Sequence, residues 1–97
     1  MIQYQVRIDE KLSPLLRCFS PELKKSLKLA LRELAYTPWS GKPLEEDLAG
    51  YHSLRVGTYR IIYKIFTEKR LLHVVSIGPR ESVYQDLENE LKKKDLV

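Results

Sequence analysis

The sequence predicts an α+β domain with the order β-α-α-β-β-β-α, in which helices cover a mostly antiparallel sheet. The N-terminus alternates apolar and polar residues, as a half-buried strand does. A long amphipathic helical pattern follows, and the second half holds three closely spaced strand-like runs before a final helical one. We therefore expect an N-terminal helical hairpin and a C-terminal helix to pack on the sheet.

The first strand and the helical hairpin are predicted from the N-terminal third of the chain. The apolar positions of the strand are Ile2, Tyr4, Val6 and Ile8. A short helix is expected over Leu12–Phe19. A second helix begins after Ser20, which supplies an N-cap before Pro21 in the first turn. Its apolar residues recur every three or four positions and end near Tyr36, because Pro38 disfavours a helical residue before it.

A stretch rich in turn-forming residues separates this hairpin from the three later strands. Two of these strands, Ser53–Val56 and Tyr59–Phe66, are separated by Gly57-Thr58, a pair suited to a two-residue type II′ hairpin. The third strand is expected over Leu71–Ile77. The last helix is predicted over Glu81–Lys94, where apolar residues lie four positions apart.

Length and composition limit the class of protein. A chain of 97 residues makes one domain, which we expect to span residues 1–97. A single cysteine, Cys18, excludes an intramolecular disulfide and a cysteine-based metal cluster, and we expect no metal and no cofactor. No segment has the ~20 apolar residues of a membrane span, and the N-terminus lacks the pattern of a signal peptide. We therefore expect a cytoplasmic protein with no membrane partner. Cys18 and Trp39 are expected to be buried.

Positive charge is concentrated in the strand region. The chain carries a net charge of +4, but the stretch from His52 to Arg80 has six basic residues against one acid, a net of +5. Clustered Lys and Arg side chains gain most by neutralising phosphates, which indicates a polyanionic partner. A solvated basic surface is the alternative interpretation.

The predicted hairpin brings two arginines together. If Gly57-Thr58 forms the turn, Val56 pairs with Tyr59 and Arg55 pairs with Arg60, on the face opposite the apolar residues. Like charges directly opposite on a sheet are unfavourable, so a bound anion between the two guanidinium groups would explain the pair. An ion pair of Arg55 with one of Glu45, Glu46 or Asp47 is the alternative.

A third arginine is expected to join this pair. A turn centred on Glu68-Lys69 sets Arg60 opposite Ile77, and the Gly78-Pro79 bend that follows would aim Arg80 over the same face. Tyr84 lies one helical turn beyond Arg80, so both side chains can point the same way. Packing of Tyr84 between helix and sheet is the alternative role.

Two segments together resemble the signature of the RelE/ParE toxin superfamily. The first is L-A-G-Y-H-S-L-R-V-G-T-Y-R-I-I-Y-K-I and the second is I-G-P-R-E-S-V-Y. The stretch T-P-W-S-G-K-P-L is similar to the corresponding connection of the related YoeB toxins. The order of elements agrees over nearly the whole chain, which implies a small RelE-like domain.

The resemblance implies the toxin of a type II toxin–antitoxin system, an endoribonuclease that cleaves mRNA in the ribosomal A site and is silenced by a cognate antitoxin. In that family the 2′-hydroxyl of the RNA attacks the adjacent phosphate without a metal and leaves a 2′,3′-cyclic phosphate. The implied catalytic residues are Arg60, Arg80 and Tyr84. Arg60 would stabilise the pentavalent phosphate, Arg80 would clamp it and help the leaving 5′-oxygen, and Tyr84 would position or deprotonate the 2′-hydroxyl or stack on the base.

Further residues are expected to bind RNA, including 16S ribosomal RNA. These are Arg55, Lys42, His52 and Lys64. RelE has two lysines in the strand before the arginine hairpin, where this chain has Tyr51 and Ser53. Because arginine is a poor proton donor, His52 and Lys42 are the candidates for the missing general acid, and His52 is expected to lie near the arginines.

Three rival functions stay open at this point. A ParE-like protein would inhibit DNA gyrase and would not cut RNA, and fold alone does not decide between the two activities. A catalytically inactive module would bind only an antitoxin. Direct binding to ribosomal RNA through charge would show a steep salt dependence without cleavage.

Overall fold

The computed structural model describes residues 3–95 and has the expected α+β architecture. Its strands are β1 (Gln5–Ile8), β2 (Lys42–Pro43), β3 (Tyr51–Val56), β4 (Tyr59–Phe66) and β5 (Leu71–Pro79). Its helices are α1 (Ser13–Cys18), α2 (Pro21–Tyr36) and α3 (Val83–Asp95), with short 3₁₀ turns at Glu10–Leu12, Pro38–Ser40 and Glu46–Leu48. The predicted order is confirmed, with the two-residue strand β2 added before β3. Ile2 lies outside the described residues.

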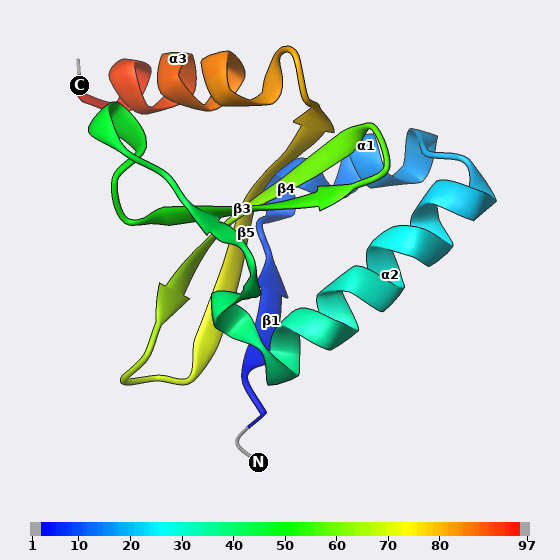
Figure 1. The fold of residues 1–97 in the computed structure, drawn as a ribbon. Coiled ribbons are helices and arrows are strands. Elements are labelled where there is room, and N and C mark those ends of the chain that lie inside the picture. Colours follow the sequence, from blue (N-terminus) through cyan, green and yellow to red (C-terminus); the bar gives the residue numbers. More distant parts are fainter. Residues whose placement is uncertain (1–2, 96–97) are drawn as a thin grey trace.

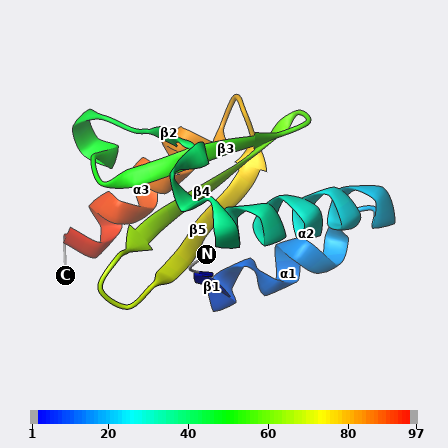
Figure 2. The same ribbon diagram turned by 60° about the horizontal axis from the view of Figure 1, so that its bottom comes forward.

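The five strands form one sheet in the order β1-β5-β4-β3-β2. β1 runs parallel to β5 and the other pairs are antiparallel, which confirms the mostly antiparallel sheet. Figures 1 and 2 show α1 and α2 on one side of the sheet and α3 on the other. The sheet is therefore a middle layer, and both of its faces need apolar residues.

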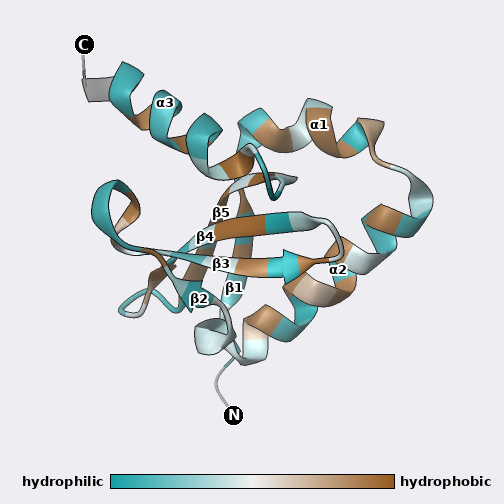
Figure 3. Ribbon diagram, turned by 45° about the horizontal axis from the view of Figure 1, so that its top comes forward, coloured by the Kyte–Doolittle hydropathy of each residue, from teal (hydrophilic) through white to brown (hydrophobic). Residues whose placement is uncertain are grey.

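Each face of the sheet has its own core, and β4 contributes to both. Ile61 and Tyr63 face α2 while Ile62 faces α3, and all three side chains are 0% exposed. Burial of an aliphatic side chain of this size stabilises the fold by about 1.5–3 kcal/mol. The α2-side core also contains Leu12, Leu27, Leu34, Leu72, Val74 and Ile77, and the α3-side core contains Leu48, Val83 and Leu87. Figure 3 shows the apolar residues along the central strands.

The long helix α2 begins and ends where the sequence predicts. The Ser20 hydroxyl accepts a hydrogen bond from the Leu23 amide at 3.2 Å, and Pro21 occupies the first turn. At the other end, the Thr37 amide donates to the Glu33 carbonyl before Pro38 stops the helix.

The β3–β4 hairpin has the predicted register. Val56 pairs with Tyr59 and Arg55 with Arg60, and Gly57 has φ 61°, as the first central residue of a type II′ turn requires. The register of β5 differs from the prediction. A β-bulge at Ile62/Tyr63 leaves Val75 unpaired, so Arg60 lies opposite Gly78 rather than Ile77.

Two predictions of burial are wrong. Cys18 is exposed at the end of α1, and Trp39 is 61% exposed. Trp39 lies on the 3₁₀ turn after α2, where Pro38 takes the buried position instead. Within residues 3–95, no helix combines the length and apolar character needed to cross a membrane.

Candidate functional site

Three arginines meet at the tip of the β3–β4 hairpin, on the face that α3 covers. They line a cavity of about 140 Å³ whose walls are the turn and the start of the segment after β5. Its lining residues are Arg55, Gly57, Thr58, Tyr59, Arg60, Arg80 and Glu81. We call this cavity the arginine pocket. With three guanidinium groups and one carboxylate, it carries excess positive charge.

Backbone pairing fixes the positions of all three arginines. Arg55 and Arg60 are direct cross-strand partners, and Arg55 Nε donates to the Gly57 carbonyl at 3.1 Å. The Arg80 amide donates to the Thr58 carbonyl at 3.2 Å, which continues the β4–β5 pairing past Pro79. Among the described side chains, no carboxylate forms an ion pair with these arginines, so the alternative pairing of Arg55 with an acid is not seen.

Arg60 has a donor without a partner. Its Nε is buried, and no hydrogen-bond acceptor among the described residues reaches it. A buried donor without an acceptor costs about 1–3 kcal/mol, so native proteins rarely keep one without a reason. An anion with several oxygen atoms in the pocket would accept a hydrogen bond from this donor. It would also lie between the two positive charges of Arg55 and Arg60 and reduce their repulsion.

Tyr84 lies beside the arginine pocket and does not line it. Its hydroxyl hydrogen-bonds the Ser53 hydroxyl at 2.9 Å, and Ser53 is only 3% exposed. Ser53 precedes Arg55 by two residues on β3, so both side chains point to the α3 face. Tyr84 also packs against the α3-side core, which is the structural role considered for it.

The two candidate lysines share this face of the sheet. Lys42 on β2 pairs directly with Ser53 and is therefore a diagonal neighbour of Arg55, a spacing of about 7–8 Å that long side chains can bridge. Lys64 lies four residues beyond Arg60 on β4, and its ammonium group stands 5.6 Å from the ring centre of Tyr51. Lys42 thus extends the cationic row across three strands, whereas Lys64 lies at the far end of β4.

His52 does not join the arginines. It alternates with Ser53 along β3 and faces α2, where it stacks on Tyr63 at 5.7 Å and meets Trp39 at 5.5 Å. Burial there lowers the pKa of His52. The expectation that His52 lies near the arginines is therefore wrong. The alternation of side chains along β3, which directs Leu54 and Val56 toward the α2-side core, also predicts that His52 faces α2.

Comparison with known proteins supports the resemblance seen in the sequence. The model of the family described as the ParE toxin of type II toxin–antitoxin systems matches residues 17–84. The chain belongs to this family. The matched segment includes all three pocket arginines and Tyr84.

Individual relatives are RelE-like toxins. The chain is 40% identical over 45 residues to two Mycobacterium tuberculosis proteins, toxin RelG and toxin RelE, a match that covers 46% of this chain. The match covers 52% and 46% of those proteins, so the chain spans about half their length. A chain of the M. tuberculosis toxin–antitoxin complex RelBE2 superposes with a TM-score of 0.74 and 31% identity, over 81% of this chain and all of that one.

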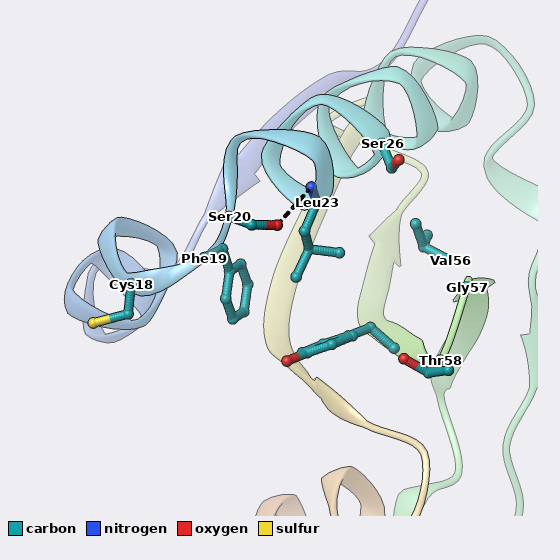
Figure 4. A pocket seen from close by; sticks show the side chains of 9 residues that line it. Cys18, Phe19, Ser20, Leu23, Ser26, Val56, Gly57 and Thr58 are labelled. Carbon is teal, nitrogen blue, oxygen red and sulfur yellow. Dashed lines mark hydrogen bonds between the residues drawn. The ribbon is translucent and has the colours of Figure 1, made fainter.

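A second cavity in this member of the family lies on the other side of the hairpin tip. It has a volume of about 470 Å³ between the α1–α2 junction and the turn (Figure 4). The nine residues that line it include no charged side chain, and Phe19 meets Tyr59 there edge to face at 5.3 Å. Sequence reasoning missed this cavity, because it depends on how the helical hairpin packs against the turn. No group of three metal-ligating side chains occurs among residues 3–95.

Proposed function

We propose that this protein is the toxin of a type II toxin–antitoxin system and an endoribonuclease that cleaves mRNA in the ribosomal A site. The unpaired Nε of Arg60 in a pocket of three arginines carries the proposal. A backbone phosphate supplies the acceptors and the negative charge that this pocket lacks. Membership in the toxin family supports the role as a toxin, and the similarity to toxin RelG and toxin RelE favours a RelE-like activity.

In the proposed reaction the 2′-oxygen of the RNA forms a bond to the adjacent phosphorus and the P–O5′ bond breaks. The products are a 2′,3′-cyclic phosphate and a 5′-hydroxyl, so one proton leaves the 2′-oxygen and one joins the 5′-oxygen. Arg60 and Arg80 stabilise the negative charge that develops on the pentavalent phosphate. Tyr84, held by Ser53, positions or deprotonates the 2′-hydroxyl or stacks on the base.

The proton for the 5′-oxygen needs a donor other than arginine, which holds its proton too tightly. Since His52 faces α2, Lys42 is the candidate that shares a face with the arginines. Its flexible ammonium group lies on the edge strand beside Arg55 and can deliver a proton to the leaving oxygen.

The proposed partners are a cognate antitoxin and the ribosome. The RelBE2 relative is part of a toxin–antitoxin complex, which supports an antitoxin for this chain. Lys64, exposed at the far end of β4, is assigned to contacts with 16S ribosomal RNA together with the cationic row.

Primer extension on a defined mRNA in programmed ribosomes tests the proposal. Wild-type protein should give cuts in the A site, and Arg80→Ala should reduce the cleavage rate about 10²–10³-fold, as loss of one donor to a transition-state oxyanion does. Arg32→Ala, an exposed arginine on α2, is the matched control and should cut normally. Absence of cuts by the wild-type protein at any concentration would refute the nuclease assignment.

Inhibition of DNA gyrase is the second candidate, because the matching family model is described as a ParE toxin. A supercoiling assay with purified gyrase separates the two activities. Inhibition of gyrase by a protein that does not cleave mRNA would replace the proposal above.

A further inference from the structure

An exposed tryptophan lies on the 3₁₀ turn that precedes β2, outside the arginine pocket. Trp39 is 61% exposed and Tyr36, at the end of α2, is 46% exposed. Trp39 is also the only tryptophan of the chain. A large aromatic side chain gains free energy by leaving water, so an exposed indole is suited to contact with a partner.

The segment that carries Trp39 is held in place by a buried tyrosine. The Tyr63 hydroxyl donates to the Pro38 carbonyl at 2.8 Å and accepts from the Gly41 amide at 3.1 Å, while Tyr63 itself is 0% exposed. A side chain at Gly41 would place its Cβ 2.4 Å from the Tyr63 hydroxyl, so glycine is required for this approach. Pro38, the first residue of the turn, and Gly41, which follows the turn, are therefore fixed to β4 at the centre of the sheet.

Among residues 3–95, the indole has one aromatic neighbour. Trp39 meets His52 at 5.5 Å with the rings inclined by 73°, and His52 stacks on Tyr63 at 5.7 Å. The fold thus gives the exposed indole a packing partner that is itself packed on the core. A preorganised aromatic side chain binds a partner at a low cost in conformational entropy.

We propose that Trp39 is a stacking platform for the bases of single-stranded RNA. A groove that binds single strands combines cations along the backbone with aromatic rings for the bases. The cations here begin at Lys42, three residues after Trp39, and continue through Arg55 to the arginine pocket. Trp39 meets His52 on the α2 face, whereas Lys42 and the arginines lie on the α3 face. A strand that wraps around the β2 edge can therefore stack on Trp39 and place a phosphate among the arginines, so the inference rests on the proposed function.

The fluorescence of Trp39 tests the platform directly, because no other tryptophan contributes. The probe is a short 2′-O-methyl oligoadenylate, which lacks the attacking hydroxyl and cannot be cleaved. Stacking should quench the emission in a saturable titration at low salt. An abasic strand of the same length carries the same charge without bases and should leave the emission unchanged.

Variants give the size of the effect. Trp39→Ala should weaken binding of the oligoadenylate, measured by anisotropy of a labelled strand, roughly 5- to 150-fold. Trp39→Phe should recover part of that loss, and Leu29→Ala, which removes another exposed apolar side chain 51% exposed on α2, should bind as the wild-type protein does. All variants should keep a cooperative melting transition, since an exposed indole adds little to the core.

Equal quenching by the abasic strand, or unchanged affinity of Trp39→Ala, would overturn the inference. Quenching by an acidic amphipathic peptide but not by the oligoadenylate would assign the surface to a protein partner and would also overturn it. The nuclease proposal is judged separately by the ribosomal cuts. A protein that stacks RNA on Trp39 but cuts no mRNA would refute only the proposed function.

Discussion

Replacing Arg60 by methionine removes two costs that the ligand-free protein carries. The buried Nε has no acceptor among the described residues, and the guanidinium group directly opposes Arg55 across the hairpin. Methionine keeps an unbranched apolar stem of similar reach, so it retains most of the packing that the arginine methylenes provide. The free domain should therefore become more stable although its function is lost, as happens where a site is built for a ligand.

The expected gain in stability follows from the cost of the unpaired donor and the cost of the charge repulsion. An unsatisfied buried donor costs about 1–3 kcal/mol, and like charges opposite on a sheet cost about 0.2–1 kcal/mol. Because only one nitrogen of Arg60 is orphaned and the side chain is partly exposed, we expect a gain of about 1 kcal/mol in the free energy of unfolding. For a domain of this size that corresponds to a rise in Tm of about 4–8 °C.

Urea denaturation in a buffer without phosphate or sulfate measures this gain, with Arg7→Met on β1 as the matched control. Arg7 is a strand arginine that is exposed, unlike Arg60, and its replacement should change stability by less than about 0.5 kcal/mol. Added phosphate should then reverse the order. At a hundredfold excess over its Kd, a ligand that binds only the folded state stabilises it by about 2.7 kcal/mol, and Arg60→Met should lose most of that gain.

Two results would refute this reasoning. If Arg60→Met destabilises the domain by about 1 kcal/mol or more in the phosphate-free buffer, Arg60 Nε has a hydrogen-bond partner in solution and stabilises the folded state. If phosphate stabilises the wild-type protein and Arg60→Met equally, the anion binds elsewhere and the arginine pocket is not its site.

Two further predictions concern the α2 side of the sheet. Tyr63→Phe should destabilise the domain by about 2 kcal/mol in urea titrations, because the buried Gly41 amide and Pro38 carbonyl lose their hydrogen-bond partner. A loss of stability below about 0.5 kcal/mol would mean that a water molecule replaces the hydroxyl. Burial lowers the pKa of His52 below its usual 6.5, so its contribution to stability is complete above that pH and is lost as the pH falls through the folded pKa. His52→Phe should remove this contribution to the pH dependence of Tm between about pH 8 and 5, and an unchanged profile would show that His52 is not its source.

The features that the sequence predicts correctly are local ones. The register of the β3–β4 hairpin follows from the Gly57-Thr58 turn and the alternation of side chains, both of which act within a few residues. The start of α2 follows from Ser20 and Pro21 in the same way. The pair of Arg55 and Arg60 could therefore be placed before any tertiary contact was known.

The errors concern contacts between distant segments. The bulge that leaves Val75 unpaired depends on two cores that compete for the side chains of β5, with Val74 and Ile77 on one face and Val75 on the other. Trp39 is a large apolar residue of a type that often packs in a core, but Pro38 occupies the buried position and the indole is exposed to solvent. Neither outcome is encoded in the spacing of residues along one element.

The bulge also explains why the arginine pocket is where it is. By shifting β5 one residue, it places Gly78 opposite Arg60, on the face that α3 covers. Val83 at the start of α3 packs against this part of β5, and a Cβ at Gly78 would lie 3.4 Å from Val83 Cβ, an ordinary contact distance. The helix therefore covers the strand beside Arg60, which accounts for a buried Nε on a partly exposed side chain.

The same shift extends the β4–β5 pairing to Pro79, so that the Arg80 amide reaches the Thr58 carbonyl at the hairpin tip. With Ile77 opposite Arg60, a large side chain would fill the space beside the guanidinium group, and Arg80 would lie beyond the end of the hairpin. The concentration of charge thus depends on the register of β5 beyond the bulge as much as on the arginines themselves.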